Sequence, residues 1–450
     1  MFDPVNESSF RLDVAGLSDP FEVLAFTGSE ALSESFVFEI DVLIDDPHLD
    51  LAGLLYRSAF LCFGPSGEGV HGQLQSLVQH EHGQGMRLSR IRLGPKLDCL
   101  ALRYSQRIFS GRSVPQIIEQ VLREHGIVGA QRRFELHGNY PARTFCTQYR
   151  ESDLQLLQRL CAQAQIHYYF EHHRDRHCLV LADDPAQLPL AGTARYRCED
   201  DGDGPEALHQ WQLQSAMAAN VSGVQRAEGQ SDLAALRSGH WLRLAGHPFA
   251  ECNRPWLLTR IEHRADPSDE PPYTNRLFAA VQLPCASAKA PSRLRMHSLQ
   301  RAWVVAVDEP QPDRLRPVAV QFDWLYQGEG AAPSHCWLPL APSLAQAPMA
   351  ALSDGVEVVV SFFEGDPDQP MISGVLQPPI AAAAADSDFD EVPQLPLPDS
   401  LVSDGLPQLL MSGEPLLLLC LIPGGGSFNH CSQSVCSCRL VTALEQSGAT

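Results

Sequence analysis

Residues 355–376 read GVEVVVSFFEGDPDQPMISGVL, and this is the most informative stretch of the chain. Its apolar run, residues 356–363, is rich in β-branched and aromatic side chains, which predicts a strand with most of both faces covered. The run ends at GDPDQP, where each proline lacks the N–H that a ladder needs and the aspartates favour local side-chain-to-backbone bonds. The chain must therefore reverse here, and residues 371–376 start a returning strand. Taken alone, the pattern predicts only a hairpin with a proline-locked turn.

Two upstream segments are interpreted together with this hairpin. Residues 317–324 read PVAVQFDW, with a large apolar side chain at every second position from Val318 to Trp324, and residues 334–340, SHCWLPL, follow a glycine-rich loop. Together the three segments resemble the OB-like barrel of VgrG, the spike protein of type VI secretion systems, which is itself similar to phage tail spikes. Residues 355–374 fit the family's last strand pair almost residue by residue, and the first segment fits through Val318, Val320, Phe322 and Trp324.

The amino-terminal part of the sequence predicts an antiparallel sheet with one solvent-exposed face. Apolar residues alternate in FRLDV, FEVLAF and FVFEIDVLI, between residues 10 and 44, and we expect breaks at residues 28–30 and 33–35. The VgrG family opens in a similar way, and its motif is matched here by Gly28, Glu30, Leu32, Ser33, Phe36, Phe38 and Ile40.

Two helices are expected within this β-rich region. Ser113 is a plausible cap for a first helix around residues 117–122, with Pro115 in its first turn. Residues 152–164 place five apolar side chains on one face after a Ser-Asp start, which predicts a second helix. The segment QYRESDLQLLQRLCAQAQIHYYFEH is similar to a VgrG signature, with Gln165 standing where the family has a glycine.

Residues 240–278 carry a third set of matches. The family has a comparable series of Gly-His-Pro, tryptophan, histidine, tyrosine and asparagine positions, found here at Gly246, His247, Pro248, Asn253, Trp256, His263, Tyr273 and Asn275. His247 is a possible ligand, but a hydrogen bond that locks its loop is the commoner role. The resemblance implies positions of a β-rich hub and not of an active site.

Length and charge limit the remaining choices. A chain of 450 residues predicts about three domains, and a net charge of −21 argues against nucleic acid as a partner. We expect no secretory signal peptide, because the first residues have no basic region and no apolar core. We also expect no membrane segment, since no apolar stretch approaches about 20 residues. The thirteen scattered cysteines are expected to stay mostly reduced in a cytoplasm.

The expected architecture is mainly β with a few helices. Residues 1–285 form a hub of tandem β-barrels, residues 286–298 a linker, and residues 299–380 an OB-like barrel that starts near Trp303. Residues 381–408 read as an alanine-, proline- and acid-rich linker, and residues 409–450 as a cysteine-containing tail. The family usually continues into a long β-helical needle, but no such repeat follows the barrel here. We therefore expect a needle-less hub, or a needle supplied by another component.

No reactive centre is expected, so the chain is interpreted as a non-enzyme. His80, Glu81 and His82 allow a metal pair on one strand face, but a solvated strand end is favoured. Glu171, His172, His173 and His177 lack the zincin order and are expected to form a polar, titratable loop around a hairpin tip at residues 174–176. Asp366 and Asp368 resemble paired carboxylates, but the turn explains them better.

The tail carries the one metal site that we predict. A hairpin at Gly424-Gly425 would bring Cys420 and Cys431 together, and Cys436 and Cys438 follow in a C-x-C spacing, with His430 as a substitute ligand. Four soft ligands suit a structural zinc. The alternative is that these cysteines are simply buried or free.

The resemblance implies a function. A VgrG-like protein is a homotrimeric spike that connects an Hcp-like tube and the baseplate to a PAAR-like tip protein or an effector. It is cytoplasmic before firing and is then secreted into the medium or a target cell. Two alternatives stay open: an effector-loading adaptor whose tail docks a toxin, favoured by a neighbouring toxin gene, and a hydrolytic effector, favoured by activity of the tail. A prophage tail hub is also compatible with these motifs.

Overall fold

The computed structural model describes residues 10–44, 49–82, 86–197, 207–214, 225–282, 295–308, 317–323, 335–344 and 352–376. Its contacts divide the chain into two compact units, which are described separately. The first unit comprises residues 1–105, 111–143 and 151–292, and the second comprises residues 106–110, 144–150 and 293–450. Strands predominate in the described residues of both units, which confirms a mainly β fold with a few helices.

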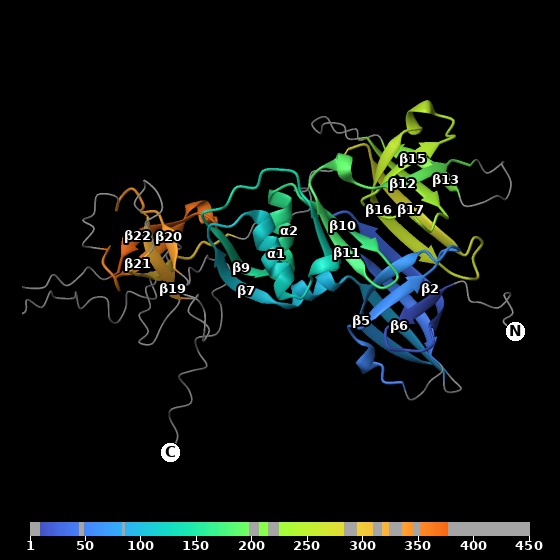
Figure 1. The fold of residues 1–450 in the computed structure, drawn as a ribbon, viewed down its shortest axis with the longest axis horizontal. Coiled ribbons are helices and arrows are strands. Elements are labelled where there is room, and N and C mark those ends of the chain that lie inside the picture. The colour runs from blue at the N-terminus through green and yellow to red at the C-terminus, as the bar shows by residue number, and fades with distance from the viewer. Residues whose placement is uncertain are drawn as a thin grey trace, which may run out of the picture. The chain divides into compact units, whose positions relative to one another are not determined.

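The first unit begins with a closed barrel (Figure 1). Six strands follow one another around a ring, and β1 pairs with both β4 and β2, so the ring has no free edge. In ring order they are β1 (Arg11–Val14), β4 (Ser58–Cys62), β5 (Gly69–His82), β6 (Met86–Gly94), β3 (Val37–Ile44) and β2 (Phe21–Ala31). Alternate side chains such as Phe38, Ile40 and Val42 are buried, as the predicted alternation requires.

A second ring of strands continues from the first. β2 pairs with β16, and from there the sheet extends in both directions until its two end strands meet at a single bridge between Tyr196 and Leu208. This ring contains β12 (Leu190–Arg195), β15 (Trp241–Ala245), β16 (Pro255–Ala265), β17 (Tyr273–Ala280), β14 (Arg226–Ser231) and β13 (Leu208–Gln214). The expected tandem β-barrel hub is therefore confirmed.

Gly28 corrects one expected strand boundary. Residues 28–30 were expected to break the strand, but β2 runs through them to Ala31. A Cβ on Gly28 would lie 2.2 Å from the ring of Phe38, its cross-strand partner on β3. The glycine makes room for a buried aromatic ring, so here it indicates close packing and not a turn.

A smaller layer of two helices and three strands is inserted after the first barrel (Figure 1). The two helices are α1 (Val114–Glu124) and α2 (Asp153–Gln163). Their N-cap residues are Ser113 and Ser152, and each forms a reciprocal capping box, which confirms both predicted caps. The strands are β8 (Arg132–Glu135), β10 (His167–His172) and β11 (His177–Ala182), with β11 antiparallel to β10 and parallel to β8.

The end of α2 stores a small amount of backbone strain. Gln165, which replaces the family glycine, has φ +54°, and the N–H of Ile166 donates to Cys161 in a Schellman-type cap. We predict that Gln165→Gly raises the free energy of unfolding by about 0.5–1 kcal/mol, because glycine adopts this conformation without a Cβ clash. Gln165→Ala is the control, since it keeps the clash and removes the bond that the Gln165 side chain donates to Ala162. Denaturant unfolding in which the alanine variant is the more stable of the two would contradict the prediction.

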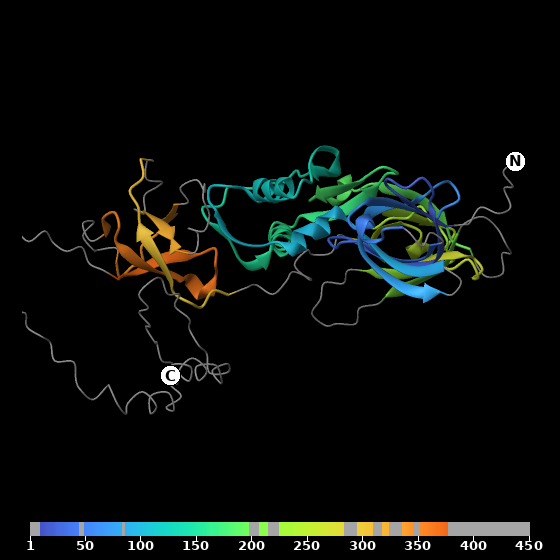
Figure 2. The ribbon, with the colours of Figure 1, turned by 90° about the horizontal axis from the view of Figure 1, so that it is seen from below.

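The second unit contains the OB-like barrel. Its sheet has the order β20 (Cys336–Leu338), β19 (Val318–Phe322), β18 (Gln300–Val304), β21 (Glu357–Phe362) and β22 (Pro370–Val375). A bridge between Leu340 and Ile372 joins the two ends, and Figure 2 shows the strong curvature of these orange strands. The barrel's first strand begins at Gln300, slightly before the expected start near Trp303. The ribbon of β7 (Tyr104–Phe109) and β9 (Cys146–Ser152) contributes residues 106–109 and 146–150 to this unit, and Phe145 packs in the barrel core.

The hairpin of β21 and β22 forms as predicted, and its first strand has one fully buried face and one half-buried face. Val358 and Val360 are fully buried, and Val359 between them is half-buried, whereas Phe363, in the short turn that follows the strand, is 54% exposed. No residue of β21 is exposed, which agrees with the expectation that most of both faces are covered. The barrel is one curved sheet, so alternate residues of β21 face its core and the remainder face outward.

This asymmetry predicts opposite results for two neighbouring substitutions. Val360→Asp should cost several kcal/mol and prevent soluble folding of the barrel, because it places an unpaired charge in a packed core. Phe363→Asp is the matched control and should change stability by less than about 0.5 kcal/mol. The check is the yield and denaturant midpoint of both variants, and equal losses in the two would contradict the burial of Val360 and the exposure of Phe363.

Candidate functional site

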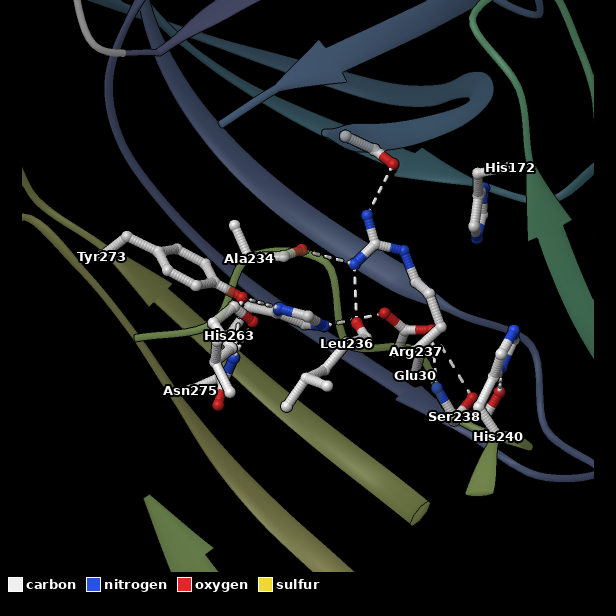
Figure 3. Close-up of polar contacts among 12 residues, drawn as sticks. Glu30, His172, Ala234, Leu236, Arg237, Ser238, His240, His263, Tyr273 and Asn275 are labelled. Atoms are coloured by element: carbon white, nitrogen blue, oxygen red, sulfur yellow. Dashed lines mark hydrogen bonds and ion pairs between the residues drawn. The ribbon is translucent and has the colours of Figure 1, made fainter. Parts of the chain in front are cut away.

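Residues from widely separated motifs meet in one buried polar network of the first unit (Figure 3). Glu30 comes from β2, His263 from β16, and Tyr273 and Asn275 from β17. The register places His263 opposite Gly28 on one side and opposite Asn275 on the other. Glu30 lies two residues after Gly28, so the side chains of Glu30, His263 and Asn275 are on the same face of the sheet. Nε2 of His263 lies 2.8 Å from Oε1 of Glu30.

The hydrogen bonds fix the tautomer of His263. Glu30 is a carboxylate acceptor, so Nε2 carries the proton that is donated to it. Nδ1 then accepts from the hydroxyl of Tyr273 at 2.7 Å, and that hydroxyl oxygen accepts from Nδ2 of Asn275 at 3.1 Å. Ser231 donates to the amide oxygen of Asn275 at 2.6 Å, which completes the chain of partners.

The charges of the network are also balanced. Burial by itself would raise the pKa of Glu30, but the hydrogen bond from His263 and the charge of Arg237 outweigh it and lower the pKa to about 2. Burial lowers the pKa of His263, so its imidazole is neutral. The guanidinium of Arg237 is held by the carbonyl oxygens of Ala234, Leu236 and Gly69. The network therefore contains one anion, one cation and a neutral imidazole.

This arrangement suits a structural lock better than a reaction. Glu30, His263 and Asn275 are at most 3% exposed, so a substrate has no access to the carboxylate–imidazole pair. Glu30 also accepts from the backbone N–H of Ser238 at 3.3 Å, so the pair joins β2 of the first barrel to the strands and the 233–238 loop of the second. The network fixes the two barrels to each other through satisfied, desolvated bonds.

A second polar cluster corrects the expectation for the 171–177 segment. The hairpin tip at residues 174–176 is confirmed, but His172 and His177 do not form a titratable loop. Nδ1 of His177 lies 2.9 Å from Nδ1 of His71, and burial lowers the pKa of His177 to about 3. Its Nε2 accepts from the backbone N–H of Lys96, and Nδ1 of His172 accepts from the N–H of His71. Because these donors point at ring nitrogens, both imidazoles are held neutral.

The titratable loop was wrongly expected at His172 and His177 because their partners come from distant parts of the sequence. Phe36, from the first barrel, packs edge-on against both His172 and His177, and the partner imidazole comes from His71 on β5. The sequence around residues 171–177 contains no sign of these neighbours. His173, at the hairpin tip, is exposed as expected.

The two carboxylates of the GDPDQP turn serve the backbone. Asp366 accepts from the N–H of Asp368 at 3.1 Å and from the side chain of Gln369. Asp368 accepts from the N–H of Thr147 at 2.6 Å, and the Thr147 hydroxyl donates to the carbonyl of Pro367. Both side chains are thus used in building the turn and attaching it to the 144–150 segment, in agreement with the structural interpretation.

The other sequence-predicted sites have different outcomes. His247 locks its loop, since its Nδ1 accepts from the N–H of Phe249 and its backbone pairs with Asn253. The side chains of His80, Glu81 and His82 lie outside the described residues, as do the zinc candidates Cys420, His430, Cys431, Cys436 and Cys438. Within the described residues, no group of three or more metal-ligating side chains is assembled. The tail zinc site stays a prediction.

Comparisons with known proteins identify the class of this tandem-barrel architecture. The model of the phage tail baseplate hub (GPD) family matches residues 29–224 and 213–269, more than half of the chain. A solved structure of an E. coli type VI secretion component, described as similar to the T4 phage tail proteins gp27 and gp5, has the same fold. It aligns with a TM-score of 0.66 and 23% identity, over 81% of this chain and 99% of that one.

The chain belongs to the phage tail baseplate hub family, and it is VgrG-like, as its motifs indicate. Two type VI secretion system spike proteins of Pseudomonas aeruginosa, VgrG4b and VgrG5, are each 32% identical to it, over 83% and 84% of this chain. The matches cover 57% and 58% of those relatives. The chain therefore spans little more than half the length of the curated relatives that it matches.

Proposed function

We propose that this protein is a structural hub of a type VI secretion spike, joining a tube of Hcp-like protein and the baseplate to the tip of the apparatus. The single observation that carries the proposal is the presence of two six-stranded rings in one chain, joined through β2 and β16. Three copies present six such rings, which can match a sixfold tube. The matched spike proteins and the hub family support the same role.

The proposed role is non-enzymatic. Glu30 and His263, the pair of motif residues most like a catalytic dyad, are buried and hydrogen-bonded to each other, so they are inaccessible. The proposal includes synthesis in the cytoplasm, expulsion with the spike, and a PAAR-like tip protein or effector as the distal partner. No helix in the described part of the chain is long and apolar enough to cross a membrane.

The proposal is tested by secretion of the tube protein. The gene is deleted in its own strain, together with any other spike genes, and tube protein is measured in the medium. We expect secretion to be absent, to return with the wild-type gene and with Phe363→Asp, and not to return with Val360→Asp. Tube secretion that is independent of this gene in the multiply deleted strain would contradict the proposed role.

A structural zinc in the tail is a separate part of the proposal. Cys420, Cys431, Cys436 and Cys438, with His430 as substitute, have the donor chemistry for tetrahedral zinc. Such an ion would stabilise a segment as short as residues 409–450. Metal analysis of protein purified without chelator should give close to one zinc per chain. Less than about half a zinc, with Cys436→Ser leaving thermal stability unchanged, would rule the site out.

A further inference from the structure

Three side chains that no motif connects form a nucleophile–base–carboxylate series in the first unit. Cys99 lies on the short helix at Lys96–Leu102, His125 follows the last residue of α1, and Asp153 is the first residue of α2. Sγ of Cys99 is 3.7 Å from Nδ1 of His125, and Nε2 of His125 is 2.7 Å from Oδ2 of Asp153. A thiol, a base in reach of it and a third group that orients the base are the signature of an activated nucleophile.

The environment of Asp153 decides which nitrogen of His125 carries the proton. Asp153 is fully buried, and the same oxygen accepts from Nε of Arg103 at 2.5 Å, so it is an ion-paired carboxylate. A carboxylate only accepts hydrogen bonds, so Nε2 of His125 is the protonated nitrogen. The lone pair of Nδ1 therefore faces the thiol of Cys99, where it can take the thiol proton.

We propose that Cys99 is a nucleophilic thiol that reacts with small disulfides, with His125 as its general base and Asp153 as the residue that positions His125. His125 takes the proton from Sγ as the sulfur attacks one sulfur of the disulfide. The old S–S bond breaks, a mixed disulfide forms on Cys99, and the released thiolate takes the proton from His125. No outside oxidant is needed, because the small disulfide is itself reduced in the exchange.

Accessibility and acidity fit this role. Cys99 is half-buried and the His125 side chain is 11% exposed, so neither group is sealed inside the core. Burial raises the pKa of Cys99, so at neutral pH its reactivity depends on a base that removes the proton. Cys62 is the natural control: it is also half-buried and burial raises its pKa too, but its described contacts include no hydrogen bond to an imidazole.

The test uses the full-length reduced protein and oxidised glutathione at pH 7. Mass spectrometry of peptides, sampled over time, gives separate rates for glutathione addition at Cys99 and at Cys62. We expect Cys99 to react at least about tenfold faster than Cys62, a threshold set below the roughly 100-fold that a positioned base typically supplies at the least. His125→Gln should bring the Cys99 rate down to the Cys62 rate, since glutamine can still bond to Asp153 but cannot accept the proton.

Cys62 also reports on folding within each sample. A variant that unfolds would show a faster Cys62 reaction, and in that case the rate ratio in the wild-type protein decides. A wild-type ratio below about two, or a Cys99 rate unchanged in a folded His125→Gln variant, would overturn the proposal. Asp153→Asn should slow Cys99 less than His125→Gln does, as expected for a positioning residue.

Discussion

Replacing Glu30 with alanine is expected to lower the free energy of unfolding of the first unit by about 3–5 kcal/mol. The substitution leaves the buried N–H of His263 without its acceptor and Arg237 without its nearby counter-charge. An unsatisfied buried donor and an uncompensated charge each carry a desolvation penalty that the wild-type network avoids. A simple loss of apolar contact at this position would be much smaller.

The matched control is Glu39→Ala, which removes an exposed carboxylate from the neighbouring strand β3. We expect it to change the free energy of unfolding by less than about 0.5 kcal/mol. Denaturant unfolding followed by circular dichroism compares both variants with the wild type. If Glu30→Ala and Glu39→Ala cost the same, the buried network does not lock the two barrels.

The second large effect is loss of stability in acid. Burial lowers the pKa of His71 and His167 to about 4 and that of His177 to about 3, below the ordinary value of 6.5. Between pH 6.5 and 4 the unfolded chain therefore binds protons that the folded chain does not, so stability is complete above pH 6.5 and falls as the pH drops. Each such histidine contributes up to about 1.4 kcal/mol per pH unit, so these three predict a loss of about 3–4 kcal/mol between pH 6 and pH 5.

Denaturant midpoints at pH 7.5, 6 and 5 measure this loss. His177→Gln should reduce the slope of this pH dependence, because it removes one of the three buried imidazoles. A free energy of unfolding that stays constant from pH 7 to pH 5 would show that the three imidazoles are not held neutral in the folded protein.

Local chemistry explains which features the sequence predicted. The β21–β22 hairpin follows from two prolines and two aspartates within six residues, and the helix starts follow from Ser113 and Ser152 with a glutamine three residues later. These signals lie within a few residues of the structure that they determine. The strand break predicted at Gly28 was wrong, because the glycine is required by the aromatic ring of Phe38, which another strand contributes.

The polar clusters depend on contacts that no local pattern contains. Glu30 and His263 were both recognised as motif positions, but they are 233 residues apart, and only the β2–β16 pairing brings them together. Cys99 and His125 lie 26 residues apart on elements whose packing was not predicted. For such sites the sequence supplies the residue types, and the fold alone supplies the distances.

The mass of the native assembly tests the proposed hub most directly. Light scattering of the purified protein at micromolar concentration, with its tube protein present, should give a particle with three copies of the 49.5 kDa chain. Three copies are expected because two barrels per chain then form the six-membered ring that meets the tube. A stable monomer under these conditions would contradict the proposal that this chain is the hub of a secretion spike.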